Sequence, residues 1–146
     1  MAQWLCKKFD DLNPHELYGI LQLRNAVFVV EQNCVFQDAD DKDQLSHHVL
    51  CIDDHNVIAY ARIVPPGISY AETSIGRVVT SPGRRAEGFG KLLMEKSIEA
   101  AYHLYGKTPL RIGAQLYLKK FYESFGFEQT SEIYIEDDIP HIEMML

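Results

Sequence analysis

Hydrophobic residues recur three or four positions apart after Pro14, which predicts a first amphipathic helix. Asn13 is a favourable N-cap, Pro14 suits the first helical turn, and Glu16 is placed to bond back to the cap. Arg24 falls on the apolar stripe, so its charge requires a carboxylate partner. The apolar positions of this helix are Leu17, Ile20, Leu21, Val27 and Phe28.

The same spacing predicts a longer helix over residues 88–105, which ends at Gly106. A short third helix is predicted over residues 116–125 and is closed by Gly126. The predicted buried face of the long helix consists of Phe89, Leu92, Leu93, Ser97, Ala100, Ala101 and Leu104.

Strand patterns fill most of the remaining chain. Residues 53–56 predict a four-residue hairpin join, Gly76 predicts a β-bulge, and the Asp-rich residues 37–44 predict a loop. The predicted strands cover residues 3–9, 49–52, 57–64, 74–79, 110–114, 127–134 and 141–146. The order β-α-β-β-β-α-β-α-β-β therefore predicts one α/β domain with a mixed sheet over residues 1–146.

Composition narrows the function classes. The 146 residues are 47% hydrophobic and 24% charged, as in globular domains, and a net charge of −7 disfavours nucleic-acid binding. No apolar run approaches the roughly 20 residues of a membrane span, and the charged N-terminus does not resemble a signal peptide. We expect a full-length cytoplasmic protein that binds neither membranes nor nucleic acids.

The cysteines and histidines predict no metal site. Cys6, Cys34 and Cys51 are widely spaced and form no C-x-x-C pair, so neither a zinc ribbon nor a disulfide framework is indicated. His47 and His48 would point to opposite faces of a strand. The histidines are therefore expected to be scattered at the surface and at edges.

The segment from residue 76 to residue 96 carries the clearest chemistry. A strand end, a basic turn and a glycine-containing loop lead into a helix, whose free N–H groups favour anions. The segment holds five basic and two acidic residues on an acidic chain. This pattern predicts a site for a phosphate-bearing ligand.

Two nucleotide-binding loops are excluded at particular positions. A P-loop requires lysine after its second glycine, whereas Phe89 follows Gly88, and a Rossmann loop requires glycine where Leu93 stands. The spacing P-x-x-R-x-x-G-x-G, which ends at Gly90, instead resembles the pyrophosphate loop of the GNAT superfamily. Members of this superfamily are acyl-CoA-dependent N-acyltransferases.

The resemblance covers nearly the whole chain. Residues 113–115 lead into a short helix that carries Tyr122 a few residues before Gly126, as in the family. The position after Arg85 is usually glycine, and Ala86 is tolerated there unless its φ is positive. The segments most similar to the ElaA branch are residues 23–34, 38–43, 75–78 and 139–142.

The resemblance implies a fold and a reaction. The fold is a GNAT-like domain with a mixed, mostly antiparallel twisted sheet of six to seven strands and about four flanking helices. The reaction is direct acetyl transfer from acetyl-CoA to an amine in a ternary complex, with Tyr122 as general acid. A bulge near Gly76 would aim an N–H at the thioester carbonyl. The residues implied in donor binding are Val78, Val79, Thr80, Arg84, Arg85, Ala86, Glu87, Gly88, Phe89, Gly90, Lys91 and Gln115.

The general base stays open, because several groups have the right chemistry. The candidates are Glu31, Asp43, Glu72 and His141. Residues 31–54 and 128–146 are strongly acidic. If both flank the acceptor groove they favour a cationic amine, although an acidic solubility surface has the same composition.

Arg24 and its nearby acids have two alternative roles. They form either a buried ion-pair network that braces the first helix or part of an acceptor pocket. For the pocket, the candidate substrate-binding residues are Arg24, Glu31, Asp43 and His141.

Two other functions remain as alternatives. The Arg24, Phe28 and acidic pattern also resembles acyl-homoserine lactone synthases, which lack a clear version of the R-x-x-G-x-G loop. A non-catalytic acyl-CoA sensor would keep the fold without turnover. The acceptor, a small-molecule or peptide amine, cannot be identified from the sequence, and a homodimer through exposed strand edges stays open.

Overall fold

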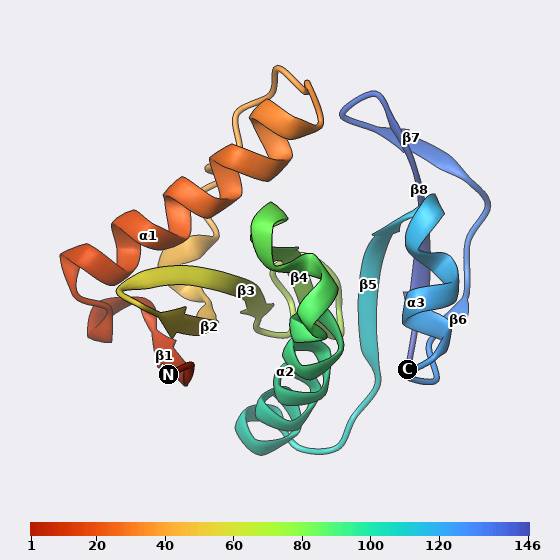
Figure 1. The fold of residues 1–146 in the computed structure, drawn as a ribbon. Coiled ribbons are helices and arrows are strands. Elements are labelled where there is room, and N and C mark those ends of the chain that lie inside the picture. The colour runs from red at the N-terminus through yellow and green to blue at the C-terminus, as the bar shows by residue number, and fades with distance from the viewer.

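An eight-stranded sheet runs through the molecule in the order β1-β2-β3-β4-β5-β8-β6, and β7 pairs with β8 (Figure 1). The computed structural model describes residues 1–146. All paired strands are antiparallel except β4 and β5, which confirms a mixed, mostly antiparallel sheet. The strands are β1 (Gln3–Lys8), β2 (His47–Asp53), β3 (Asn56–Val64), β4 (Thr73–Thr80), β5 (Leu110–Gln115), β6 (Glu128–Gln129), β7 (Tyr134–Glu136) and β8 (Ile139–Met145).

Helices cover both faces of this sheet (Figure 1). The helical segments are α1 (Pro14–Arg24), α2 (Phe89–Tyr105), α3 (Lys119–Glu123), a π-helix at Asn25–Glu31 and 3-10 turns at Phe9–Asp11, Asp43–Leu45, Pro82–Glu87 and Leu116–Leu118. Side chains alternate along β3. Ala59 and Ala61 pack in the cluster of α2 and α3, whereas Tyr60 packs with Ile20 and Leu23 of α1.

The start of α1 forms as its residues predict. The Asn13 side chain accepts a hydrogen bond from the Glu16 N–H at 2.8 Å, and the Asn13 N–H donates to the Glu16 carboxylate at 2.9 Å. This capping box satisfies two helix-terminal donors. Gly19 then lets α1 approach β3, because a Cβ there would lie 2.7 Å from Cγ2 of Val57.

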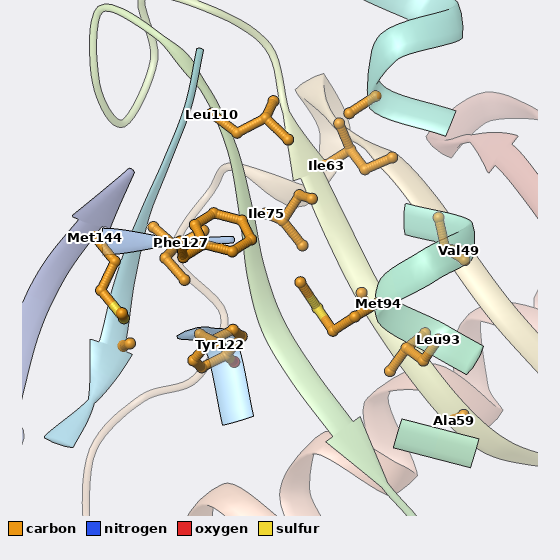
Figure 2. Close-up of a cluster of buried hydrophobic side chains, with 14 of the residues drawn as sticks. Val49, Ala59, Ile63, Ile75, Leu93, Met94, Leu110, Tyr122, Phe127 and Met144 are labelled. Atoms are coloured by element: carbon orange, nitrogen blue, oxygen red, sulfur yellow. The ribbon is translucent and has the colours of Figure 1, made fainter. Parts of the chain in front are cut away.

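The larger core cluster lies between the sheet and the helices α2 and α3, and it contains Tyr122 (Figure 2). The predicted buried face of α2 is wrong at Leu92, which is exposed, while Met94 is buried. The fully buried positions Leu93, Met94, Ser97 and Ala101 show that the helix is rotated slightly from the predicted phase.

One predicted turn and one predicted strand differ in the structure. The turn between β2 and β3 needs only Asp54 and His55, both at positive φ, instead of four residues. The predicted strand over residues 127–134 is interrupted, since Glu128–Gln129 pair as β6 and Tyr134 begins the separate strand β7. Residues 130–133 are not part of a strand, and the hydroxyl of Ser131 accepts a hydrogen bond from the Glu143 N–H before β7 pairs with β8 again.

Candidate active site

A cavity of about 650 Å³ opens where β4 and β5 separate. The two strands pair only through Thr73 with Leu110 and Ser74 with Arg111, and then diverge. The cavity is lined by β4 from residue 75 to residue 80, by β5, α3 and the β7–β8 turn, and by the chain after α1. Its volume is typical of a small-molecule site.

A β-bulge lies on the β4 wall of this cavity. The β3–β4 register shifts so that Arg77 and Val78 have no partner on β3. The bulge expected near Gly76 is present, but the positive φ of 51° belongs to Arg77. A non-glycine residue keeps this conformation only where its surroundings hold it. Asp38 supplies that hold, because its carboxylate lies 2.8 Å from Nε of Arg77 and its carbonyl oxygen accepts from Nη2 at 3.0 Å.

The same loop supplies carboxylates to a buried ion-pair network behind the cavity. Arg24 contacts Asp38 at 2.6 Å and Asp43 at 2.8 Å. Arg62 contacts Asp43 at 2.9 Å and Asp40 at 2.7 Å. Burial raises the pKa of Asp43, but hydrogen bonds and charge from both arginines outweigh it and lower that pKa. The carboxylate is therefore held ionised.

Arg24 and Asp43 lie in the buried network and not in the cavity. Arg24 is fully buried, and neither residue lines the cavity. Of the two alternative roles, the structure shows the ion-pair network that braces α1. Arg24 and Asp43 are therefore not carried forward as acceptor-binding residues, and Asp43 is not carried forward as a base.

His48 extends the network and corrects the expectation of surface histidines. It is 1% exposed, with Nδ1 2.6 Å from the Tyr60 hydroxyl and Nε2 2.9 Å from the carbonyl oxygen of Asp43. The carbonyl can only accept, so Nε2 carries the proton and Nδ1 accepts from Tyr60. Burial lowers the pKa of His48, which opposes a second proton.

The predicted phosphate loop lies beside the cavity. Residues 82–87 form a 3-10 turn, Gly88 has a φ of 79°, and no side chain caps the start of α2. The first-turn N–H groups therefore have no side-chain acceptor. Ala86 does not have a positive φ, so alanine is tolerated at that position.

The loop residues fall into two groups relative to the cavity. Val78, Val79, Thr80, Arg85, Gly90 and Gln115 line it. Ala86, Glu87, Gly88, Phe89 and Lys91 do not line it, and their part in donor binding stays a prediction from the resemblance. Arg84 also lies outside the lining.

The two arginines of the loop have different partners. Arg84 contacts Asp53 at 2.8 Å and Glu87 at 2.7 Å, and it lies over the ring of Phe89. Its guanidinium is thus directed away from the cavity. Arg85 lines the cavity and pairs with Glu31.

Tyr122 combines burial with access to the cavity. It is only 6% exposed, it packs edge-on against Phe121 and Phe127, and it lines the cavity. Burial raises the pKa of Tyr122 well above its ordinary value, so the phenol is protonated at neutral pH. The side chain therefore borders the cavity as a neutral phenol.

The wall formed by β5 and β8 carries the other titratable groups. His141 lines the cavity, its Nδ1 lies 2.7 Å from the carbonyl oxygen of Ile139, and its Nε2 faces Glu136 at 3.5 Å. Glu72 does not line the cavity, because it pairs with Arg111. It is therefore not carried forward as a base.

Two tyrosines near this wall were missed by sequence reasoning. Tyr134 stacks on His141, and a Cβ at Gly113 would lie 3.0 Å from the Tyr70 hydroxyl and 3.1 Å from that of Tyr134. A side chain at this position would therefore require the two tyrosine hydroxyls to shift. No spacing in the sequence links residues 70 and 134, since each lies in a different loop or short strand.

Comparison with known proteins assigns the chain to a family. The profile of the acetyltransferase (GNAT) domain matches residues 15–146. The chain belongs to the GNAT acetyltransferase family. Membership supports acyl-CoA-dependent acyltransferase activity, and it confirms the resemblance found in the loop.

Similar proteins share the whole fold. Protein ElaA of Escherichia coli is 42% identical over 99% of this chain and 95% of its own, and its crystal structure aligns with a TM-score of 0.93. A crystal structure of an acyl-CoA N-acyltransferase from Pseudomonas aeruginosa is 42% identical over 99% of both chains, with a TM-score of 0.95. An aminoglycoside 6′-N-acetyltransferase complexed with coenzyme A shares the fold alone, at 15% identity over 97% of this GNAT chain and 96% of its own and a TM-score of 0.68.

Neither a membrane-spanning helix nor a cluster of metal-ligating side chains is present in the structure. None of its helices combines the length and apolar character needed to cross a bilayer. No three His, Cys, Asp or Glu side chains gather in a metal-ligand arrangement.

Proposed function

We propose that this GNAT protein transfers an acetyl group from acetyl-CoA directly to the primary amine of a cationic acceptor. One observation supports this most strongly. A free strand edge on β4, an uncapped helix start at α2 and a buried phenol at Tyr122 meet at a single cavity. These are the parts that an acyl-CoA thioester and a leaving thiolate require.

The β4 side of the cavity fits the donor. The backbone of Val78 to Thr80 faces the separation from β5 and offers pairing groups to an amide-containing pantetheine arm. The N–H groups at the start of α2 and the guanidinium of Arg85 fit its phosphates. Bound there, acetyl-CoA supplies an activated acyl group as its thioester.

The reaction needs one group that donates a proton and one that accepts a proton, and the two walls of the cavity each provide one. A C–N bond forms between the acceptor amine and the acyl carbon while the C–S bond breaks. Tyr122 donates its proton to the departing sulfur and is then reprotonated from solvent. His141, oriented by its Nδ1 contact with the Ile139 carbonyl, takes the amine proton directly or through water.

The charges of the cavity favour a cationic acceptor. Glu136 and Asp137 line its mouth, whereas the lining contains only two cations, Arg77 and Arg85. Arg77 is neutralised by Asp38, and Arg85 is neutralised by Glu31. The acidic groups of the β7–β8 turn therefore attract an amine that carries additional positive charge.

A turnover assay distinguishes an acetyltransferase from a non-catalytic acyl-CoA sensor. Acetyl-CoA consumption is measured against a panel of polyamines, amino-acid amides and lysine peptides. Tyr122→Phe should lower kcat about 100-fold while leaving the acetyl-CoA Kd unchanged, because general acids contribute roughly 100- to 10,000-fold.

Tyr105→Phe is the matched control, because it removes a phenol that does not line the cavity. It should keep full turnover. Donor binding without turnover for any amine would favour the sensor, and absence of donor binding at millimolar acetyl-CoA would contradict both.

A further inference from the structure

A short segment, residues 31–34, crosses the cavity and contacts three of its walls. Gln32 and Gln115 exchange two amide hydrogen bonds, of 3.1 and 3.3 Å. The Cys34 thiol lies 3.0 Å from the carbonyl oxygen of Asp137 on the β7–β8 turn. Glu31 pairs with Arg85 beside α2. We call residues 31–34 the strap.

Glu31 binds the guanidinium group that the proposed function assigns to the donor phosphates. Nη1 of Arg85 donates to one carboxylate oxygen at 2.8 Å, and Nη2 donates to the other. One carboxylate thus occupies the Nη1–Nη2 edge of the guanidinium. The pair is open to solvent, with side-chain exposures of 45% for Arg85 and 39% for Glu31.

No other arginine of the lining replaces Arg85. Arg84 is directed toward Asp53 and Glu87 outside the cavity, and Arg77 is held by Asp38 at the bulge. Arg85 is therefore the guanidinium placed to meet donor phosphates, and in the free protein Glu31 occupies it.

We propose that Glu31 is an internal competitor of the donor pyrophosphate for the guanidinium of Arg85. This inference rests on the proposed function. Glu31 binds the Nη1–Nη2 edge of the Arg85 guanidinium, so a phosphate that takes this same edge must displace it. Pyrophosphate carries more negative charge than one carboxylate and displaces Glu31, whereas an acyl-pantetheine without phosphates leaves the pair intact.

Displacement also links the donor to the acceptor. Once Arg85 binds phosphate, the Glu31 carboxylate is released at a mouth already lined by Glu136 and Asp137. The added negative charge favours a cationic amine after the donor has bound. The strap thereby orders binding, with the donor first.

The test is a calorimetric double-mutant cycle with acetyl-CoA. Because exposed ion pairs are weak, Glu31→Gln should tighten acetyl-CoA binding about two- to fivefold, and Arg85→Ala should weaken it. In the Arg85→Ala background, Glu31→Gln should give no further tightening. S-acetyl-pantetheine should bind the wild type and Glu31→Gln equally.

Glu72→Gln is the matched control, since Glu72 also pairs with an arginine but lies outside the cavity. It should leave acetyl-CoA affinity unchanged. Equal tightening by Glu72→Gln, or tightening by Glu31→Gln that survives in Arg85→Ala, would show a general charge effect and overturn the competition. Unchanged affinity in Glu31→Gln would also overturn it. If the wild type and all variants fail to bind acetyl-CoA, the proposed function itself is wrong.

Discussion

The protein uses arginine–carboxylate pairs in two regions with opposite properties. The network behind the cavity is nearly closed to solvent, with side-chain exposures of 1% for Arg24, 4% for Arg62 and 11% for Asp43. The Arg85–Glu31 pair at the mouth is roughly 40% exposed. Removing one member of a buried pair leaves an uncompensated charge, whereas water replaces a partner at the surface. Burial therefore distinguishes a fixed support from an exchangeable contact.

The largest expected effect tests the buried region. Asp43→Asn leaves Arg24 and Arg62 with one carboxylate fewer, so the free energy of unfolding should fall by about 3–5 kcal/mol. Glu31→Gln should change it by less than about 0.5 kcal/mol. Urea denaturation measures both, and similar losses for the two variants would end the distinction between the regions.

The next effect concerns Arg77, where the network meets the cavity. Arg77→Ala keeps a side chain at positive φ but removes the ion pairs that hold it, which should cost about 1–3 kcal/mol. Arg77→Gly loses the same pairs without the backbone strain, so it should be the more stable variant. The turnover of Arg77→Ala should also fall about tenfold while its acetyl-CoA Kd stays constant. A glycine variant as unstable as the alanine variant would argue against a strained bulge.

A smaller effect on the free energy of unfolding is expected when the pH is lowered. Because burial lowers the pKa of His48, the unfolded chain takes up a proton near pH 6.5 and the folded chain only at lower pH. The contribution of His48 to stability is therefore complete above about pH 6.5 and decreases as pH falls through the folded pKa. His48→Gln should flatten the loss of unfolding free energy between pH 7 and 5. Some slope should remain, since burial also lowers the pKa of His47.

The smallest expected effect is that of salt on the exposed pair. Raising NaCl to about 0.5 M shortens the Debye screening length to a few ångströms. The difference in acetyl-CoA affinity between Glu31→Gln and the wild type should then fall below about twofold. The stability loss of Asp43→Asn should persist. A salt-sensitive Asp43→Asn loss would indicate that its network is solvated.

Local chemistry made part of the fold and site predictable. The capping box at Asn13, the glycine-containing turn before α2 and the bulge near Gly76 are short-range features with their own signatures. They suffice to place the loop beside the free edge of β4. The interactions that define these motifs join residues only a few positions apart. Their predicted boundaries are therefore close to the observed ones.

Long-range pairing could not be predicted in the same way. Arg24 clearly needed a carboxylate, but nothing in the sequence shows that Asp38 holds both Arg24 and Arg77. Likewise, nothing in the sequence shows that Gln32 meets Gln115 at the cavity. These contacts follow from tertiary geometry, so they are absent from spacing and composition.

A crystal structure of the protein with coenzyme A tests the comparison most directly. We expect the pyrophosphate at the start of α2, Arg85 bonded to phosphate, Glu31 displaced, and the contacts of Arg24 and Arg62 unchanged. Coenzyme A bound elsewhere, or bound while Arg85 still holds Glu31, would contradict the division between a fixed network and an exchangeable pair.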